Sequence, residues 1–168
     1  MFNPFLKITR LYRNITEGIK NLIIWFPVIW NDRQWDHYFI YKILHKKLDL
    51  AEHFFRYNGN HLNAEDDADK IKVCVILLDR LLKDEYDTRA FKDFYKKWGE
   101  IELTFTDSEN YPDMYECHTK AKNVKTKDDE IQERKDFKSA KEKENYSRQN
   151  DINYLFEMMK RHIEGWWD

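Results

Sequence analysis

Residues 63–82 read NAEDDADKIKVCVILLDRLL and predict the most buried helix of the chain. Three acidic residues, Glu65 to Asp67, stand in the first turn after Asn63, where carboxylates complement the positive end of a helix dipole. The apolar residues recur at helical spacing and form one wide face: Ala68, Ile71, Cys74, Val75, Leu78, Leu81 and Leu82. A face this wide must be covered by other helices, so the chain is expected to fold as an all-α protein.

Helices are also expected before this segment. Asn3-Pro4 is a good helix start, and the first helix should end near Trp25, because Pro27 cannot continue the backbone ladder. Residues 26–30 would then cross the core. A second helix is predicted from Arg33 to Tyr57, with Asp32 as its N-cap and Gly59 as a left-handed C-cap.

The second half of the chain predicts shorter elements and a charged helix. A short helix should begin at Asp87 or Thr88 and end before Gly99, and the alternation over 101–106 predicts one short isolated strand. Residues 107–127 are expected to form an exposed loop. Helices are predicted over 128–147 and from Asn150 to Ile163. The prediction is a single helical domain over residues 1–168, a bundle of five or six helices.

Composition limits the function classes. The net charge of −2 argues against a protein that coats nucleic acid, so no nucleic-acid partner is expected. The apolar run 22–30 contains Pro27 and is far shorter than the ~20 residues that span a bilayer, so no membrane span is expected. Cys74 and Cys117 stand in unrelated settings and predict no disulfide, which favours a reducing, cytoplasmic location.

The first helix has two interpretations. Its polar positions carry Lys7, Arg10, Arg13 and Lys20 against Glu17 alone. A basic amphipathic helix can lie on a membrane surface, but a helix packed in a bundle shows the same pattern. Because the apolar spacing is the one that packs another helix, we expect bundle packing.

The segment 30–38 concentrates aromatic and charged side chains and is the candidate binding site. A planar ring can stack on Trp or Tyr, an arginine can hold a phosphate, and a carboxylate can accept hydrogen bonds from hydroxyl groups. On one helix, residues four apart share a face, so Asp32 with Asp36, and Arg33 with His37, should converge. The candidate ligand-binding residues are Trp30, Asp32, Arg33, Trp35, Asp36, His37 and Tyr38. The alternative is an N-capping turn beside core tryptophans.

Catalytic and metal-binding patterns are weak. Four histidines recur every eight residues, but at about 100° per residue they wind around a helix and do not converge. Glu65, Asp66, Asp67 and Asp69 are expected to be a solvated helix start, although such a cluster could hold Mg²⁺ in a nucleotide hydrolase. The four glycines are isolated and form no phosphate loop. We therefore predict no catalytic residue, no metal site and no cofactor, and the sequence favours a protein that is not an enzyme.

Two tryptophan signatures carry a resemblance. The string Trp30-Asn31-Asp32-Arg33-Gln34-Trp35-Asp36 and the ending His162-Ile163-Glu164-Gly165-Trp166-Trp167-Asp168 resemble small, predominantly helical, uncharacterised proteins of tailed bacteriophages. The resemblance covers most of the chain and implies no established activity. Small phage proteins include inhibitors of host defence, some of which sequester nucleotide signals. By analogy, the resemblance implies that the protein acts against host defence in the cytoplasm of an infected bacterium.

Three functions follow as hypotheses. The first is a non-enzymatic protein that captures a small anionic or nucleotide-like ligand at residues 30–38. The second is a structural or interaction module in which exposed aromatics, Trp166 and Trp167, bind a protein partner or a second copy of the chain. A carboxylate-dependent nucleotide hydrolase comes third.

Overall fold

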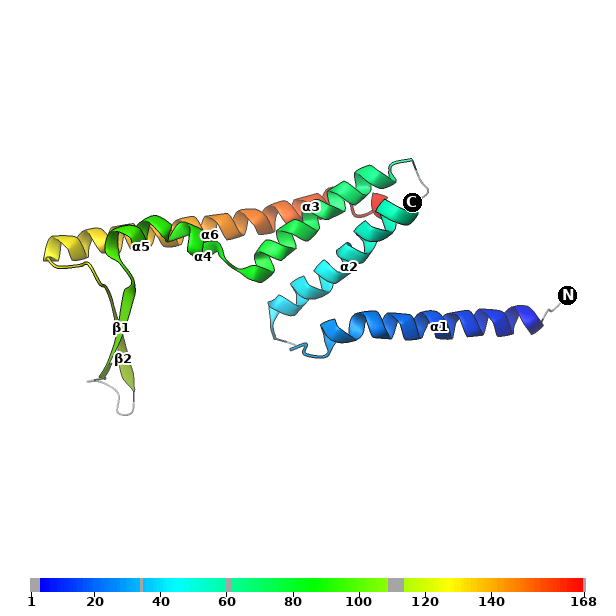
Figure 1. Ribbon diagram of the computed structural model, residues 1–168, viewed down its shortest axis with the longest axis horizontal. Coiled ribbons are helices and arrows are strands. Elements are labelled where there is room, and N and C mark those ends of the chain that lie inside the picture. The colour runs from blue at the N-terminus through cyan, green and yellow to red at the C-terminus, as the bar shows by residue number, and fades with distance from the viewer. Residues whose placement is uncertain (1–3, 34, 60–61, 109–113, 168) are drawn as a thin grey trace. The chain divides into compact units, whose positions relative to one another are not determined.

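The computed structural model describes residues 4–33, 35–59, 62–108 and 114–167, with side chains described from residue 8 to residue 166 within these ranges. Six α-helices and one antiparallel strand pair make up the described elements (Figure 1). The elements are α1 (Pro4–Ile29), α2 (His37–Asn58), α3 (Ala64–Lys83), α4 (Tyr86–Ala90), α5 (Lys92–Trp98), β1 (Ile101–Asp107), β2 (Tyr115–Ala121), α6 (Lys127–His162) and a 3-10 turn (Gly165–Trp167). The predicted all-α class is confirmed, as is the short strand near 101–106.

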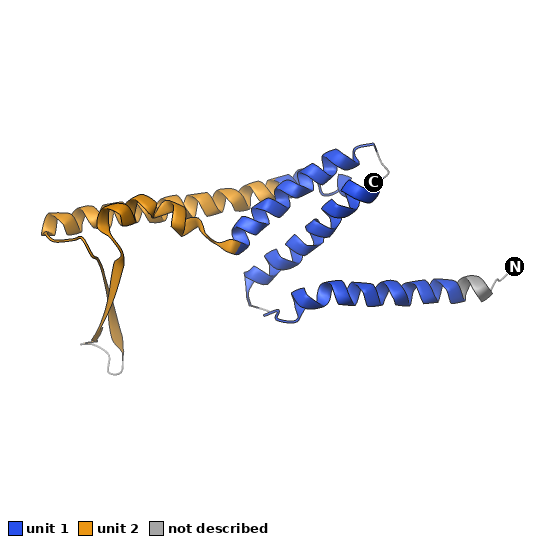
Figure 2. Ribbon diagram, viewed as in Figure 1, with its two compact units in different colours: residues 1–82, 158–168 blue, residues 83–157 orange. Residues whose placement is uncertain are grey.

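The chain divides into two compact units (Figure 2). Unit 1 contains residues 1–82 and 158–168, and unit 2 contains residues 83–157. The single domain expected from the sequence stays a prediction.

Helix α3 forms the centre of unit 1, as its sequence predicts. Its buried residues are Ala64, Asp67, Ala68, Ile71, Cys74, Val75, Leu77, Leu78 and Leu81. Leu48 and Phe55 are the buried residues of α2. Polar contacts also join the two helices: Nη2 of Arg56 donates to Asp69 at 2.8 Å, and Nε2 of His45 lies 3.1 Å from Oδ1 of Asp79. The predicted status of α3 as the most buried helix is confirmed.

Helix α1 continues past Pro27, so the prediction that it ends near Trp25 is wrong. Pro27 lies in the last turn, where its missing N–H leaves one carbonyl, that of Ile23, without its helical donor. Ile23 is exposed, so water can replace the missing donor. The ladder resumes at once, since the amide of Trp30 donates to the carbonyl of Phe26 at 3.0 Å. Residues 26–30 therefore end a helix and do not cross a core.

Helix α2 begins four residues later than predicted, at His37. Gly59 follows it with φ −66° and ψ 124°, so the predicted left-handed cap is also wrong. Glycine is required at position 59 because there is no room for a side chain. A Cβ built on Gly59 would lie 2.5 Å from the carbonyl oxygen of Phe55 and 2.6 Å from Cβ of Ala64.

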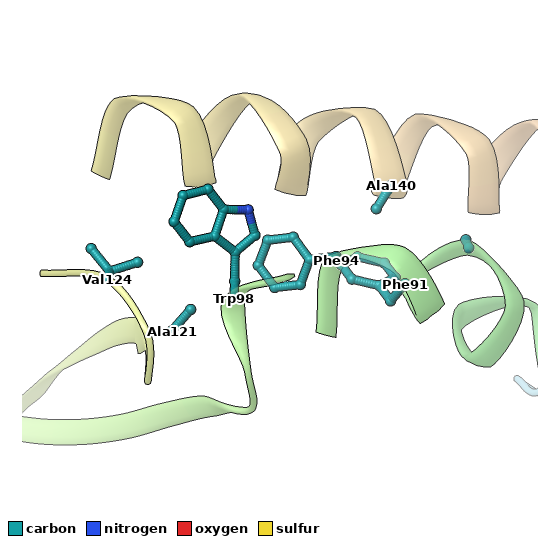
Figure 3. Close-up of a cluster of buried hydrophobic side chains, with 7 residues drawn as sticks. Phe91, Phe94, Trp98, Ala121, Val124 and Ala140 are labelled. Carbon is teal, nitrogen blue, oxygen red and sulfur yellow. The ribbon is translucent and has the colours of Figure 1, made fainter. Parts of the chain in front are cut away.

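Unit 2 has its own apolar core, in which Phe91, between α4 and α5, and the aromatic residues Phe94 and Trp98 of α5 face the charged helix α6 (Figure 3). The ring of Phe137 on α6 contacts Phe91 at 5.3 Å and Phe94 at 5.6 Å between centroids. The buried members are Ala90, Phe91, Phe94, Trp98, Ala121, Val124 and Ala140. These apolar residues pack against the first part of α6, residues 127–150, which is mostly polar.

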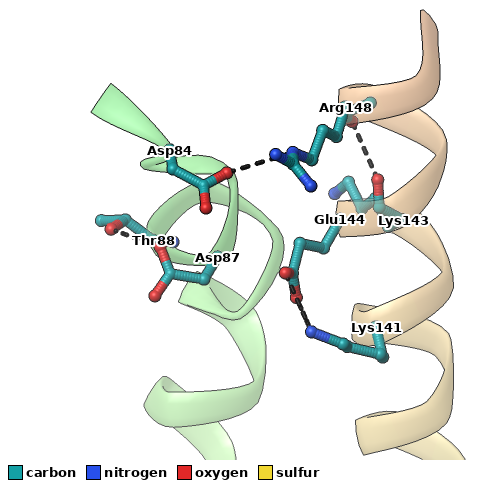
Figure 4. A network of polar contacts seen from close by, with 8 residues as sticks. Asp84, Asp87, Thr88, Lys141, Lys143, Glu144 and Arg148 are labelled. Atoms are coloured by element: carbon teal, nitrogen blue, oxygen red, sulfur yellow. Dashed lines mark hydrogen bonds and ion pairs between the residues drawn. The ribbon is translucent and has the colours of Figure 1, made fainter. Parts of the chain in front are cut away.

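Polar contacts join the same elements of unit 2 (Figure 4). Asp84 has φ 50°, a left-handed conformation that aspartate tolerates better than most residues, and its carboxylate lies 3.3 Å from Nε of Arg148 on α6. The hydroxyl of Tyr86 donates to the buried carboxylate of Asp151 at 2.6 Å.

A hairpin arm extends from this core. β1 and β2 pair antiparallel, with Phe105 opposite Cys117 and Thr104 opposite His118. The prediction that 107–127 forms a loop is wrong for residues 115–121, because strand pairing uses their backbone groups. Most of the side chains of both strands are exposed, as expected for this region.

Helix α6 is continuous from Lys127 to His162, so the two helices predicted over this region are one. No proline or glycine interrupts the sequence between them. A reciprocal cap starts the helix: the amide of Thr126 donates to Asp129 at 2.9 Å, and the amide of Asp129 donates to Oγ1 of Thr126 at 3.1 Å. These bonds to Thr126 hold the pKa of Asp129 below its usual value.

Candidate functional site

The turn that joins α1 to α2 is held by local hydrogen bonds. The amide of Asp32 donates to the carbonyl of Ile29 at 3.1 Å, and the amide of Asp36 donates to the carbonyl of Arg33 at 3.0 Å. Oδ1 of Asp36 accepts from the amide of Tyr38 at 2.9 Å and so caps α2. The prediction of Asp32 as the N-cap of α2 is therefore wrong, because Asp36 is the capping residue.

A cavity of about 270 Å³ lies beside this turn in unit 1. Its lining contains five of the seven predicted ligand-binding residues: Asp32, Arg33, Trp35, Asp36 and His37. Apolar residues from the first two turns of α2 complete it: Phe39, Ile40 and Ile43. The sequence did not predict these three as site residues, although they immediately follow the charged string at helical spacing.

The remaining two predicted residues lie outside this lining. Trp30 is 68% exposed and packs on Phe26 with 4.6 Å between ring centroids. Tyr38 is at the surface, where Nζ of Lys42 lies 4.8 Å from its ring centroid. Neither tryptophan of the string is a core residue, because Trp35 is 84% exposed.

The cavity lining carries two carboxylates, one guanidinium and one imidazole, which are arranged across a turn and not along one helix. Arg33 donates from Nη1 to the carbonyl of Asp32 at 3.2 Å, and Nδ1 of His37 lies 3.9 Å from Oδ1 of Asp36. The expected convergence of Asp32 with Asp36 on one helical face is wrong, because the helix starts after both residues. The cavity combines a cationic fork, an imidazole and an apolar wall, groups that can hold a planar ring with an anionic substituent.

The C-terminal signature is placed differently from its prediction. Trp166 is 2% exposed, so it is part of the interior of unit 1 and cannot be an exposed partner surface. The 3-10 turn Gly165–Trp167 carries it inward, and burial of so large an apolar ring is favourable. The side chain of Trp167 lies outside the described residues.

The acidic start of α3 is used in ion pairs. Nζ of Lys70 contacts Oδ2 of Asp66, and Arg56 of α2 pairs with Asp69 at 2.8 Å. Within residues 4–33, 35–59, 62–108 and 114–167, no group of three or more His, Cys, Asp or Glu side chains is placed to hold a metal ion. Burial raises the pKa of the Cys74 thiol to about 11, which makes it a poor nucleophile at neutral pH.

A second surface is larger than the cavity. Ten apolar side chains, from α1 and from Trp30 directly after it, lie on one side of the helix. At about 100° per residue, their directions around the helix axis fall within about 120°. All ten are exposed; for example, Ile15 is 53% and Leu22 67% exposed. We call this set the α1 apolar face: Ile8, Leu11, Tyr12, Ile15, Ile19, Leu22, Ile23, Phe26, Ile29 and Trp30. The expectation that this stripe packs inside a bundle is wrong.

Helix α1 is attached through other positions. Trp25 and Val28 lie outside the α1 apolar face and are half-buried, and they belong to the end of the helix that leads into α2. The anchoring positions are therefore separate from the exposed stripe.

Comparison with known proteins finds no matching family model, no similar curated protein and no matching solved structure. Among the described residues, no helix is long and apolar enough to cross a membrane.

Proposed function

We propose that this protein is a non-enzymatic interaction module that binds a partner surface through the α1 apolar face. The observation that carries the proposal is the exposure of all ten side chains of that face. Monomeric proteins rarely expose contiguous apolar patches above a few hundred Å², and larger patches mark interaction sites. Covering an Ile, Leu or Phe side chain completely contributes about 1.5 to 3 kcal/mol, so even partial burial of this face is a large driving force.

The proposed partner surface is the N-terminal helix α1 and not the C-terminal tryptophans that the sequence suggests. Trp166 is buried, whereas the α1 apolar face offers aromatic and branched aliphatic side chains over most of a helix of 26 residues. Tyr and Trp are enriched among the residues that supply most of the binding energy in protein interfaces. A second copy of the chain, another protein and a lipid surface are all partners that such a face could bind.

A position-specific cross-linking experiment tests this function. The photoreactive residue benzoylphenylalanine is placed at Leu22 in one variant and at Asn21 in a second, and both are irradiated in cells that produce the protein. Both positions are exposed on the same turn of α1, but only Leu22 belongs to the α1 apolar face. We expect covalent adducts from position 22 and few or none from position 21. Equal yields at the two positions, or none at either, would contradict the proposal.

A second function is favoured by the cavity beside the turn. Five predicted residues line it, and Arg33 with His37 could bind the anionic part of a ligand whose ring packs on Trp35. We propose capture of a small anionic or nucleotide-like ligand there. The resemblance to small phage proteins suggests a host-defence signal as the class of ligand.

Ligand capture is tested by thermal unfolding with a panel of nucleotides and cyclic dinucleotides. A ligand at one hundred times its Kd stabilises the folded state by about 2.7 kcal/mol, which is a measurable rise in Tm. Arg33→Gln should remove the rise, whereas Lys42→Gln, a change on α2 outside the cavity lining, should keep it. No rise with any compound would exclude this second function.

The proposed location is the cytoplasm, in a bacterial host if the chain is phage-encoded. Both cysteines are free, with Cys74 buried and Cys117 exposed on β2. An exposed free thiol is stable under reducing conditions, which supports this location.

A further inference from the structure

We propose that the partner of the α1 apolar face is the surface of an anionic lipid bilayer, with α1 lying in the plane of the headgroups. This inference rests on the proposed interaction function and names its partner. Three features of α1 carry it: the charge of its polar side, the length of its apolar side and the position of its aromatic residues.

The polar side of α1 is basic although the chain is not. It carries Lys7, Arg10, Arg13 and Lys20, whereas the net charge of the whole chain is −2. The acidic residue of α1, Glu17, pairs with Lys20 at 2.8 Å, so it neutralises a charge that stands beside it and leaves the first three turns uniformly positive. A helix that combines a basic side with an exposed apolar side matches the chemistry of a bilayer surface with anionic headgroups.

The same charges disfavour a second copy of α1 as the partner. Each copy of α1 carries four basic residues against one glutamate, so pairing two copies would bring together helices of the same charge. Repulsion between like charges weakens helix pairing. An anionic surface removes this repulsion and turns the basic row into an attraction.

The dimensions of the face also fit a planar partner. A helix of 26 residues is about 39 Å long, and the α1 apolar face extends from Ile8 to Trp30 along most of it. Charged residues occupy the opposite side from Arg10 to Lys20, which suits this part of the helix to lie along the surface. A flat lipid surface can cover the whole stripe at once.

Two aromatic residues stand near one margin of the apolar face. Tyr12 and Trp30 point in the same direction from the helix axis at helical spacing, and both are exposed. Tyr and Trp prefer the boundary between hydrocarbon and headgroups, because an apolar ring carries one polar group. Their common edge would fix the rotation of α1 at that boundary.

The experiment is flotation of the full chain with vesicles of phosphatidylcholine alone and of phosphatidylcholine with one-third phosphatidylglycerol. We expect binding to the anionic vesicles that exceeds binding to the neutral ones by about tenfold at low salt and weakens as salt rises. Ile15→Gln with Leu22→Gln should abolish binding, whereas Asn14→Gln with Asn21→Gln, the adjacent polar positions, should preserve it. Circular dichroism checks that each variant keeps its helical content.

A second pair of variants separates charge from apolar contact. Arg10→Gln with Arg13→Gln should lower binding to anionic vesicles toward the level on neutral ones, and Arg10→Lys with Arg13→Lys should retain it. Equal binding to both vesicle types, no binding, or binding by the Ile15 and Leu22 variant would overturn the inference. If vesicles do not bind but position 22 cross-links to a protein, the interaction function stands and only the lipid partner is excluded.

Discussion

The indole Nε1 of Trp98 donates a hydrogen bond of 2.9 Å to Oδ2 of Asp136, and this bond joins α5 to α6. The same oxygen accepts from Nζ of Lys97 at 2.7 Å, while Gln132 donates to the other oxygen at 2.8 Å. Trp98 is buried in the core of unit 2, so one residue supplies both apolar packing and a polar anchor for the charged helix.

Trp98→Phe should destabilise unit 2. The phenyl ring fills part of the space but leaves the carboxylate of Asp136 without its indole donor, and hydrogen bonds to charged groups contribute about 1.5 to 3 kcal/mol. Urea unfolding followed by circular dichroism measures the loss. Tyr95→Phe is the control, because Tyr95 lies on the same helix with its ring exposed. An equal effect of the two substitutions would show that the bond to Asp136 contributes nothing.

The stability of unit 2 should fall at acidic pH through the same carboxylate. The ion pair with Lys97 and the bond from Trp98 lower the pKa of Asp136 from 3.8 to about 2. A group whose folded-state pKa is depressed stabilises the fold above its unfolded pKa and loses that contribution as pH falls toward the folded value. The urea midpoint should therefore drop between about pH 5 and about pH 2. Asp136→Asn should show a smaller drop over this range, and an identical drop would contradict the assignment.

Gly59→Ala should destabilise unit 1, although the backbone of Gly59 suits any residue. The new Cβ would lie 2.5 Å from the carbonyl oxygen of Phe55, which is backbone and cannot move without disturbing α2. Overpacking of this kind costs about 1 to 3 kcal/mol. Gly18→Ala is the control: its Cβ would meet nothing within 4 Å, and helix propensity should make it stabilising by about 0.5 to 1 kcal/mol. Thermal unfolding should shift in opposite directions for the two variants.

Asp36→Ala should weaken the start of α2, because the side chain of Asp36 caps the amide of Tyr38. Loss of such a cap costs about 1 kcal/mol. Asp32→Ala should have little effect on stability, since Asp32 is exposed and precedes the capping residue by four positions. Denaturant unfolding of the two variants measures the difference. The reverse order would restore the sequence-based assignment of Asp32 as the cap.

The helices were predictable where a segment has one wide apolar face. Residues 64–83 form the buried helix that their spacing predicts, and the alternation over 101–106 predicts β1. The boundaries were less predictable. Pro27 does not end α1, since a helix near its end loses only one backbone bond at a proline. The strand β2 forms by pairing with β1, a contact that the residue pattern of 115–121 does not contain.

The sequence predicted most of the residues of the candidate site but not their arrangement in space. Five predicted residues line the cavity because they are neighbours in one turn, and a turn keeps sequence neighbours close in space. The exposure of Trp35 and the burial of Trp166 could not be read from residue type, since tryptophan serves equally as a core residue and as a surface residue.

By itself, the sequence determined the helical class, the central helix and the segment that holds the cavity. Local spacing, capping groups and residue type encode these features, and they act over a few residues. The tertiary structure decided which apolar stripe is covered. α1 and α3 both carry such a stripe, yet α3 is buried and the α1 apolar face is open, because burial depends on which other segments pack against a helix and not on the helix itself.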